Sequence, residues 1–173
     1  MKFYIFLTIL IFTKVCFATY HFGISPSDVN TQKLAVEAGL GWEMHILSIS
    51  VILNSQYSEK DFVDTPIPHS NYTNLGEKRI GSDIGIDYSR KFDIEALPLL
   101  HPYLGIGLYM GRRSTIVKSN VSDTYWAQNN TSMSLVGFFG GFILGEDEKI
   151  NFGLGYHNIK GLSLSLIIPA TVK

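Results

Sequence analysis

The sequence predicts an all-β protein, an eight-stranded antiparallel transmembrane β-barrel preceded by a cleaved signal peptide. Three observations lead to this fold class. An apolar leader starts the chain, apolar and polar residues alternate along most of the remaining residues, and the polar connections differ sharply in length. Period-two alternation is typical of strands with one apolar and one polar face. Hydrophobic residues make up 46% of the 173 residues and charged residues only 17%, which excludes an intrinsically disordered chain.

The leader spans residues 1–18. Lys2 supplies a positive charge, and the apolar run after it is too short to cross a membrane as a helix. Cys16 and Ala18 put small residues at the two positions that a signal peptidase recognises. We therefore expect cleavage after Ala18, which leaves residues 19–173 as one barrel domain. Because the only cysteine lies in the leader, a disulfide scaffold and a cysteine-based zinc site are excluded.

Eight alternating segments of the mature chain are predicted to be strands. In chain order they are 20–24 (YHFGI), 33–42 (KLAVEAGLGW), 45–56 (HILSISVILNSQ), 79–88 (RIGSDIGIDY), 100–111 (LHPYLGIGLYMG), 132–144 (SMSLVGFFGGFIL), 149–157 (KINFGLGYH) and 162–168 (LSLSLII). The first is short and has His21 on its polar face. The second sets leucine, valine and tryptophan opposite glycines and Glu37. The third alternates less cleanly, because Ile46 and Ile52 fall among the serines of its polar face.

The later strands have the same pattern with one exception. The fourth sets isoleucines and Tyr88 opposite Arg79, glycines and two aspartates, and the fifth alternates aliphatic residues with glycine and tyrosine. The sixth is apolar on both faces, and its adjacent Gly140 and Gly141 suggest a β-bulge. The seventh and eighth alternate cleanly, with glycines or serines on the polar face. No stretch of the mature chain shows a convincing helical stripe.

The connections between these strands are predicted to be unequal at the two ends of the barrel. The two longest, 57–78 and 112–131, fall at the same end and are rich in Asn, Ser, Thr and Asp. The other end of the barrel has mostly short turns and carries both termini of the domain. This inequality is typical of outer-membrane barrels, whose long loops are extracellular.

The composition of the two faces indicates which one lies inside. Glycine dominates the polar face, and small residues suit the narrow interior of an eight-stranded barrel. In this arrangement Arg79, Asp83 and Asp87 point into the lumen, whereas the opposite arrangement would place them in lipid, at a cost of about 2–4 kcal/mol for an arginine at the midplane. A soluble ligand-binding barrel with an apolar interior stays open as an alternative, since alternation alone does not say which face is inside.

The candidate site is a polar network in the lumen. Its predicted members, which share the polar faces of the strands, are Glu37, Arg79, Asp83, Asp87, His101 and His157. The favoured interpretation is a set of structural salt bridges and hydrogen bonds, because each buried charge needs a partner. The alternative is a metal or proton site built from the lumen histidines. No catalytic residue, metal or cofactor is predicted.

Two segments resemble a known family. The strand LHPYLGIGLYMG at 100–111 resembles the Pro-Tyr-x-Gly-x-Gly strand of small bacterial outer-membrane barrels of the outer-membrane-protein-A type, and NFGLGYHNIKGLSLSL from Asn151 resembles their closing hairpin. The resemblance implies a barrel in the bacterial outer membrane. The chain departs from the family at its end, IIPATVK, which lacks the aromatic residue that helps the insertion machinery recognise such barrels.

The expected function is non-catalytic, either membrane-structural or an interaction at the cell surface. The expected partners are the lipid bilayer with its lipopolysaccharide and an extracellular partner bound through loops 57–78 and 112–131, and the protein is expected to be a monomer. A net charge of −1 gives no indication of nucleic-acid binding. The alternative is a lipid A-modifying barrel enzyme, a deacylase or an acyltransferase. His69 with Asp61 or Asp64 supplies suitable residue types, although the family order and spacing are missing.

Overall fold

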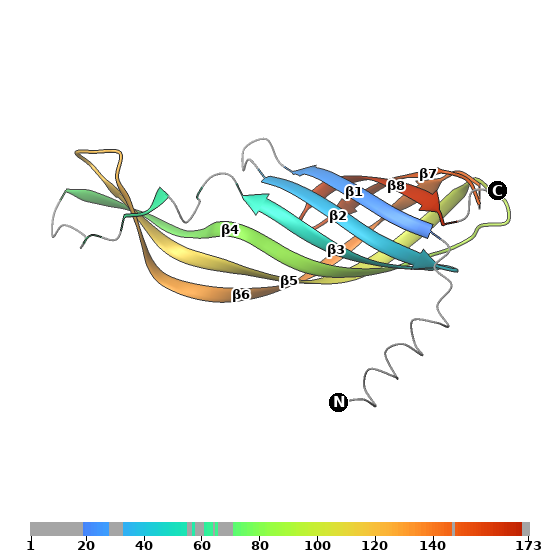
Figure 1. Cartoon of the computed structure of the whole chain (residues 1–173), viewed down its shortest axis with the longest axis horizontal. Helices are drawn as coiled ribbons and strands as arrows, with labels where there is room; N and C mark the ends of the chain where they lie inside the picture. The colour runs from blue at the N-terminus through green and yellow to red at the C-terminus, as the bar shows by residue number, and fades with distance from the viewer. Residues whose placement is uncertain are drawn as a thin grey trace, which may run out of the picture.

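The computed structural model describes residues 19–27, 33–54, 57, 61–63, 65, 71–146 and 148–170. The predicted signal peptide lies outside these residues and stays a prediction. The described strands are β1 (Thr19–Ser27), β2 (Lys33–Trp42), β3 (His45–Asn54), β4 (Tyr72–Lys91), β5 (Leu100–Ser119), β6 (Tyr125–Leu144), β7 (Asn151–His157) and β8 (Gly161–Pro169). Each pairs with the next in antiparallel fashion, and β8 returns to β1, which closes the barrel (Figure 1). The predicted eight-stranded antiparallel barrel is confirmed.

The faces of the barrel wall show which side meets lipid. Leu104, Leu108 and Met110 are each about two-thirds exposed, whereas Tyr103 and Tyr109 on the opposite face of the same strand are buried in the lumen. Large apolar side chains are exposed in this way around the whole wall, and together they form the apolar belt: Tyr20, Phe22, Ile24, Leu34, Val36, Leu47, Ile49, Leu53, Ile84, Ile86, Tyr88, Leu104, Ile106, Leu108, Met110, Val136, Phe138, Phe142, Leu144, Phe152, Leu154, Tyr156, Leu162 and Leu164. A soluble barrel buries such side chains. The barrel therefore has the faces of a transmembrane barrel.

No helix among the residues placed by the structure is long and apolar enough to cross a membrane.

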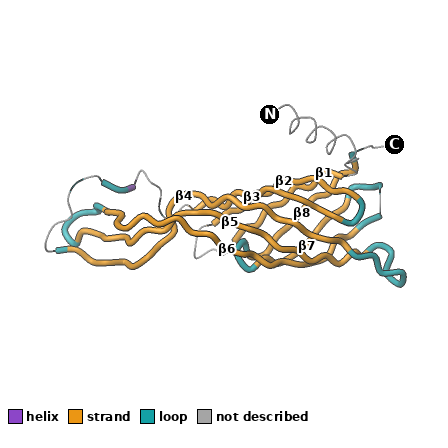
Figure 2. Tube along the Cα trace, turned by 90° about the horizontal axis from the view of Figure 1, so that it is seen from below, coloured by secondary structure: helices purple, strands orange, loops and turns teal. Residues whose placement is uncertain are grey.

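Three strands are much longer than the sequence predicted. β4, β5 and β6 have 20 residues each, and their outer parts were expected to belong to loops. The prediction of long loops at 57–78 and 112–131 is therefore wrong for residues 72–78, 112–119 and 125–131. These residues form a three-stranded extension, made of 72–80, 112–119 and 125–131, which projects beyond the barrel at the end opposite the termini (Figures 1 and 2).

The extension has a small core of its own. Ile116 and Val117 are adjacent in β5 and both buried, so both faces of the sheet are covered there. Part of this cover comes from the connection before β4, where the ring of Tyr57 packs edge-on against Tyr125 and the amide of Val63 donates a 3.1 Å hydrogen bond to the Tyr125 carbonyl. Burial on both faces removes the alternation by which strands are recognised, which is why the sequence suggested loops.

The irregularities of the sheet also differ from expectation. Gly140 and Gly141 pair in unbroken register with β5, so the predicted bulge is absent. A Cβ at Gly141 would meet the backbone of Leu154 on β7, which explains a small residue there without a bulge. Register shifts lie instead between Arg113 and Thr115 in β5, between Asn74 and Gly76 in β4 and, at the base of the extension, between Ile80 and Ile84, where Gly81 has a φ of 69°. Positive φ favours glycine, and this last shift marks the point where β4 leaves the barrel.

Candidate functional site

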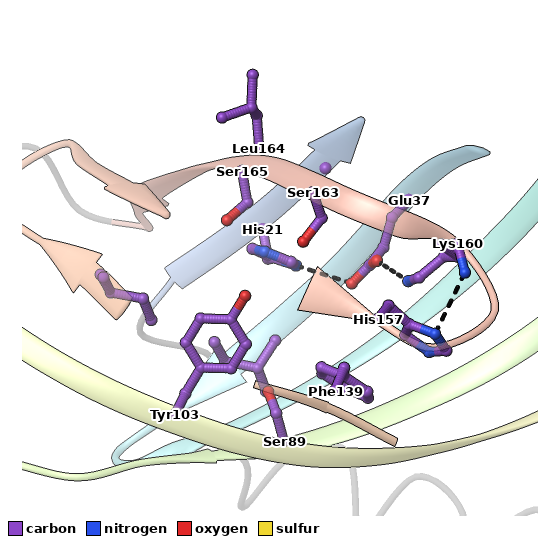
Figure 3. A pocket seen from close by; sticks show the side chains of 13 residues that line it. His21, Glu37, Ser89, Tyr103, Phe139, His157, Lys160, Ser163, Leu164 and Ser165 are labelled. Atoms are coloured by element: carbon purple, nitrogen blue, oxygen red, sulfur yellow. Dashed lines mark hydrogen bonds and ion pairs between the residues drawn. The ribbon is translucent and has the colours of Figure 1, made fainter. Parts of the chain in front are cut away.

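Lys160 is the centre of the polar network in the lumen. It lies in the turn between β7 and β8, which folds inward so that the side chain is 97% buried, as its relative exposure of 3% shows. Its Nζ forms an ion pair with Glu37, donates a hydrogen bond of 3.1 Å to Ser50 Oγ, and lies 2.8 Å from Asp87 Oδ2. Lys160 thus joins a carboxylate of β2 to a carboxylate of β4 (Figure 3 shows the Lys160–Glu37 side).

Asp87 is held by hydroxyl groups as well as by Lys160. The hydroxyls of Ser50 and Tyr109 both donate to its carboxylate. The Tyr109 hydroxyl also lies 2.9 Å from His157 Nε2. Because His157 Nδ1 accepts the backbone N–H of Ile159 at 3.0 Å, the ring proton belongs on Nε2, which donates to the tyrosine oxygen. Every polar atom of this part of the network then has a partner.

Glu37 is held in the same manner on the other side of Lys160. Ser48 Oγ donates to Glu37 Oε1 at 2.5 Å, and His21 Nδ1 lies 3.3 Å from the same oxygen. One lysine therefore serves two buried carboxylates, and each carboxylate also depends on hydroxyl donors. Buried charges are tolerated only with such compensation, so this arrangement is a structural network that holds strands β2, β3, β4 and β5 to the β7–β8 turn.

The other predicted members of the network lie elsewhere in the barrel. Arg79 and Asp83 form an ion pair of 3.1 Å near the base of the extension. His101 lies at the end that carries the termini, where Nδ1 is 2.8 Å from Asp93 Oδ1 and Nε2 is 3.2 Å from the carbonyl of Gly145. The structure thus brings Glu37, Asp87 and His157 together and separates Arg79, Asp83 and His101 from them.

The sequence analysis did not include Lys160 among the predicted members of the lumen network. Lys160 falls in the short connection between the last two predicted strands, where side chains normally point to solvent. Charge balance was the available signal, because Glu37 and Asp87 in one narrow lumen require a cation. Tyr109 and Ser50 were correctly placed on polar faces, but alternation does not reveal which carboxylate they meet.

The space left in the lumen is small. A cavity lined by His21, Glu37, Tyr103 and Lys160, among others, leaves about 20 Å³ for water centres, which is room for about one water (Figure 3). His21 Nδ1 has no well-aligned hydrogen bond among the described residues, so a water here would complete its bonding. A wider vestibule of about 440 Å³ opens at the end with the termini.

The catalytic and metal-binding alternatives concern residues that the structure describes only in part. Among the residues that the structure describes, no group of three or more His, Cys, Asp or Glu side chains could hold a metal ion. His69 and Asp64, which the sequence offered for lipid A chemistry, lie outside the described residues.

A glycine in the lumen wall tests how tightly the network is packed. A Cβ at Gly107 would contact Asp87 and would lie 2.8 Å from the ring of Tyr109. We expect Gly107→Ala to destabilise the barrel by about 1–3 kcal/mol through overpacking, measured by urea unfolding of the purified protein in lipid. Gly23→Ala is the matched control, because its Cβ would come no nearer than 3.3 Å to Glu37. Equal destabilisation by both changes would contradict the packing described here.

Similarity to known proteins is found among solved structures and not among families or curated sequences. No known protein family matches the sequence, and no curated protein matches it. Among solved structures, the chain is similar to the crystal structure of neisserial surface protein A (NspA), with a TM-score of 0.46 and 16% sequence identity over 87% of this chain and 93% of that one.

Proposed function

We propose that this protein is a monomeric barrel of the bacterial outer membrane whose role is non-catalytic. It holds the three-stranded extension outside the cell, where the extension binds an extracellular protein partner. The observation that carries the proposal is the continuity of β4, β5 and β6, which cross the apolar belt and go on as one sheet beyond it (Figure 2). A rigid sheet rooted in a barrel presents a binding surface at fixed height and orientation.

The membrane part of the proposal is supported by the closure of the sheet and by its faces. Within a bilayer every backbone polar group needs a partner, which limits spanning structures to helices and closed barrels. This barrel closes through β1 and β8 and turns the apolar belt outward. The lipids that the belt would contact are phospholipid on one side and lipopolysaccharide on the other. The long extension and the short turns lie at opposite ends, as in outer-membrane proteins.

The binding part of the proposal is supported by the edges of the extension. β7 pairs with β6 only from Phe139 toward the end with the termini, so residues 128–131 of β6, which belong to the extension, have no strand on their outer edge within the described chain. The outer edge of β4 over 72–80 is likewise without a strand partner there. Unpaired strand edges accept an extended segment of another protein, whose backbone supplies the missing hydrogen bonds.

The non-catalytic part of the proposal is supported by the lumen. The most completely buried polar groups, among them Asp87 and His157, are enclosed around Lys160, with a cavity for about one water beside them. A lipid substrate has no room at these groups. We therefore assign the lumen network to stability and place the interaction on the extension.

Deletion of two of the three strands of the extension, those from β5 and β6, tests its role in binding. Arg112 and Ser132 face each other in register, so residues 113–131 are replaced by an Asn-Gly turn that closes the β5–β6 hairpin. We expect the barrel to fold and to keep its heat-dependent gel mobility, while intact cells lose attachment to a panel of immobilised extracellular-matrix and serum proteins. The matched control replaces only Val121 and Ser122 at the hairpin tip by Asn-Gly. Attachment that survives deletion of the extension would show that binding lies elsewhere.

A further inference from the structure

The turn between β4 and β5 carries an unusual number of exposed apolar side chains for a connection at the aqueous end of a barrel. This β4–β5 turn comprises residues 92–99 and lies at the end with the termini (Figure 1). Four of its eight side chains are large, apolar and exposed, namely Phe92, Ile94, Leu97 and Leu99, and the last two are about half exposed. Contiguous exposed apolar surface marks a contact with a membrane or a protein.

The exposed side chains continue the apolar belt. Side chains alternate along β4, so Tyr88, Arg90 and then Phe92 succeed one another on the lipid-facing side. The guanidinium carbon of Arg90 lies 5.8 Å from the centre of the Phe92 ring. Met44 and Ile150, on the two neighbouring turns at the same end, are exposed as well. The apolar surface therefore does not stop at the last strand residue but runs onto the turns.

Several backbone hydrogen bonds hold the β4–β5 turn in its folded shape. The amide of Phe92 donates to the carbonyl of Pro102 at 2.8 Å, and the amide of Leu97 donates to Ile94 at 2.9 Å. The carbonyl of Leu99 accepts the amide of Gly145 from the next turn at 3.0 Å. Each backbone group that is paired in this way can enter a region poor in water without losing a hydrogen bond.

Two acidic side chains, Asp93 and the exposed Glu95, interrupt the apolar surface of the turn. Asp93 turns toward the mouth of the barrel, where it meets Nδ1 of His101 at 2.8 Å and Nζ of Lys91 at 3.6 Å. On the outer side, His45 stacks against Tyr88 with ring centres 5.8 Å apart and is bonded to its hydroxyl. Aromatic side chains with polar atoms are typical of the level at which lipid headgroups begin.

We propose that the β4–β5 turn is a lipid anchor, whose apolar side chains insert between the headgroups and acyl chains of the phospholipid leaflet on the side of the termini. The inference rests on the proposed membrane location. It adds that the β4–β5 turn binds this leaflet, in addition to the contact that the apolar belt makes with the hydrocarbon chains.

Site-specific fluorescence tests the anchor. The full-length mature chain, with Trp42→Phe and Trp126→Phe to remove its natural tryptophans, receives Leu97→Trp and is reconstituted in phosphatidylcholine–phosphatidylglycerol vesicles. We expect emission to fall by about half when the acyl chains carry bromine near the headgroup, because side chains of interfacial segments reach about 5–10 Å into this boundary. Quenching by aqueous iodide should be weak.

Two control positions separate this inference from the membrane proposal itself. Leu108→Trp in the apolar belt should be quenched by brominated lipid, and Val121→Trp at the tip of the extension should be quenched only by iodide. If Leu108→Trp escapes brominated lipid, the membrane location is wrong. If Leu108→Trp is quenched while Leu97→Trp responds only to iodide, the turn lies in water and the anchor is refuted. Protection of Leu97→Trp from both quenchers would mean that protein covers the turn, which also refutes it.

Discussion

Replacing Lys160 by methionine is expected to destabilise the barrel by about 3–5 kcal/mol, because it leaves two buried carboxylates without their cation. Glu37 and Asp87 would keep their hydroxyl donors but would lose the charge that compensates both of them. The free energy of unfolding is measured by urea titration in lipid vesicles, and the fraction folded is monitored by gel mobility without heating.

Matched variants show whether the loss comes from buried charge. Lys149→Met removes a lysine from an exposed ion pair with Glu146 and should cost less than about 1 kcal/mol. Adding Glu37→Gln and Asp87→Asn to Lys160→Met removes the uncompensated charges and should recover most of the lost stability. If Lys160→Met matches the parent protein within the error of the titration, Lys160 does not hold the network together.

Replacing Leu108 by arginine is expected to destabilise the membrane-embedded barrel by about 2–4 kcal/mol and to lower its yield in the membrane. Leu108 is 65% exposed on the lipid side of β5, and its register partners Ile86 and Val136 are also in the apolar belt. A charge at this depth has no partner and cannot easily reach water. The measurements are the free energy of unfolding in vesicles and the amount of heat-modifiable protein in the membrane fraction.

The control for this change is Val121→Arg. Val121 is 80% exposed at the tip of the extension, where an arginine meets water, so we expect no measurable loss of stability. If Leu108→Arg assembles as well as Val121→Arg, the apolar belt does not face lipid, and a soluble barrel or a protein-covered wall becomes the better interpretation.

The strands of the barrel wall could be predicted because two different environments lie on their two sides. In β7, Phe152, Leu154 and Tyr156 are exposed on the lipid side while the glycines and His157 are buried, as the alternation indicated. The same reasoning failed for the extension, where the adjacent residues Ile116 and Val117 of β5 are both buried because both faces of the sheet are covered there. Once both faces of a strand share similar surroundings, the period-two signal disappears.

The sequence by itself determined the number of strands in the wall and the acidic residues that share one face of it, because alternation separates the two faces of a strand. Only the tertiary structure decided which of those residues meet. Lys160 and Glu37 are 123 positions apart and become neighbours because β8 closes on β1 and the β7–β8 turn folds inward. Arg79 and His101 lie on the same polar face but at other levels along the barrel axis than Glu37 and Lys160. The level of a residue along this axis depends on strand register and tilt, and alternation encodes neither of them.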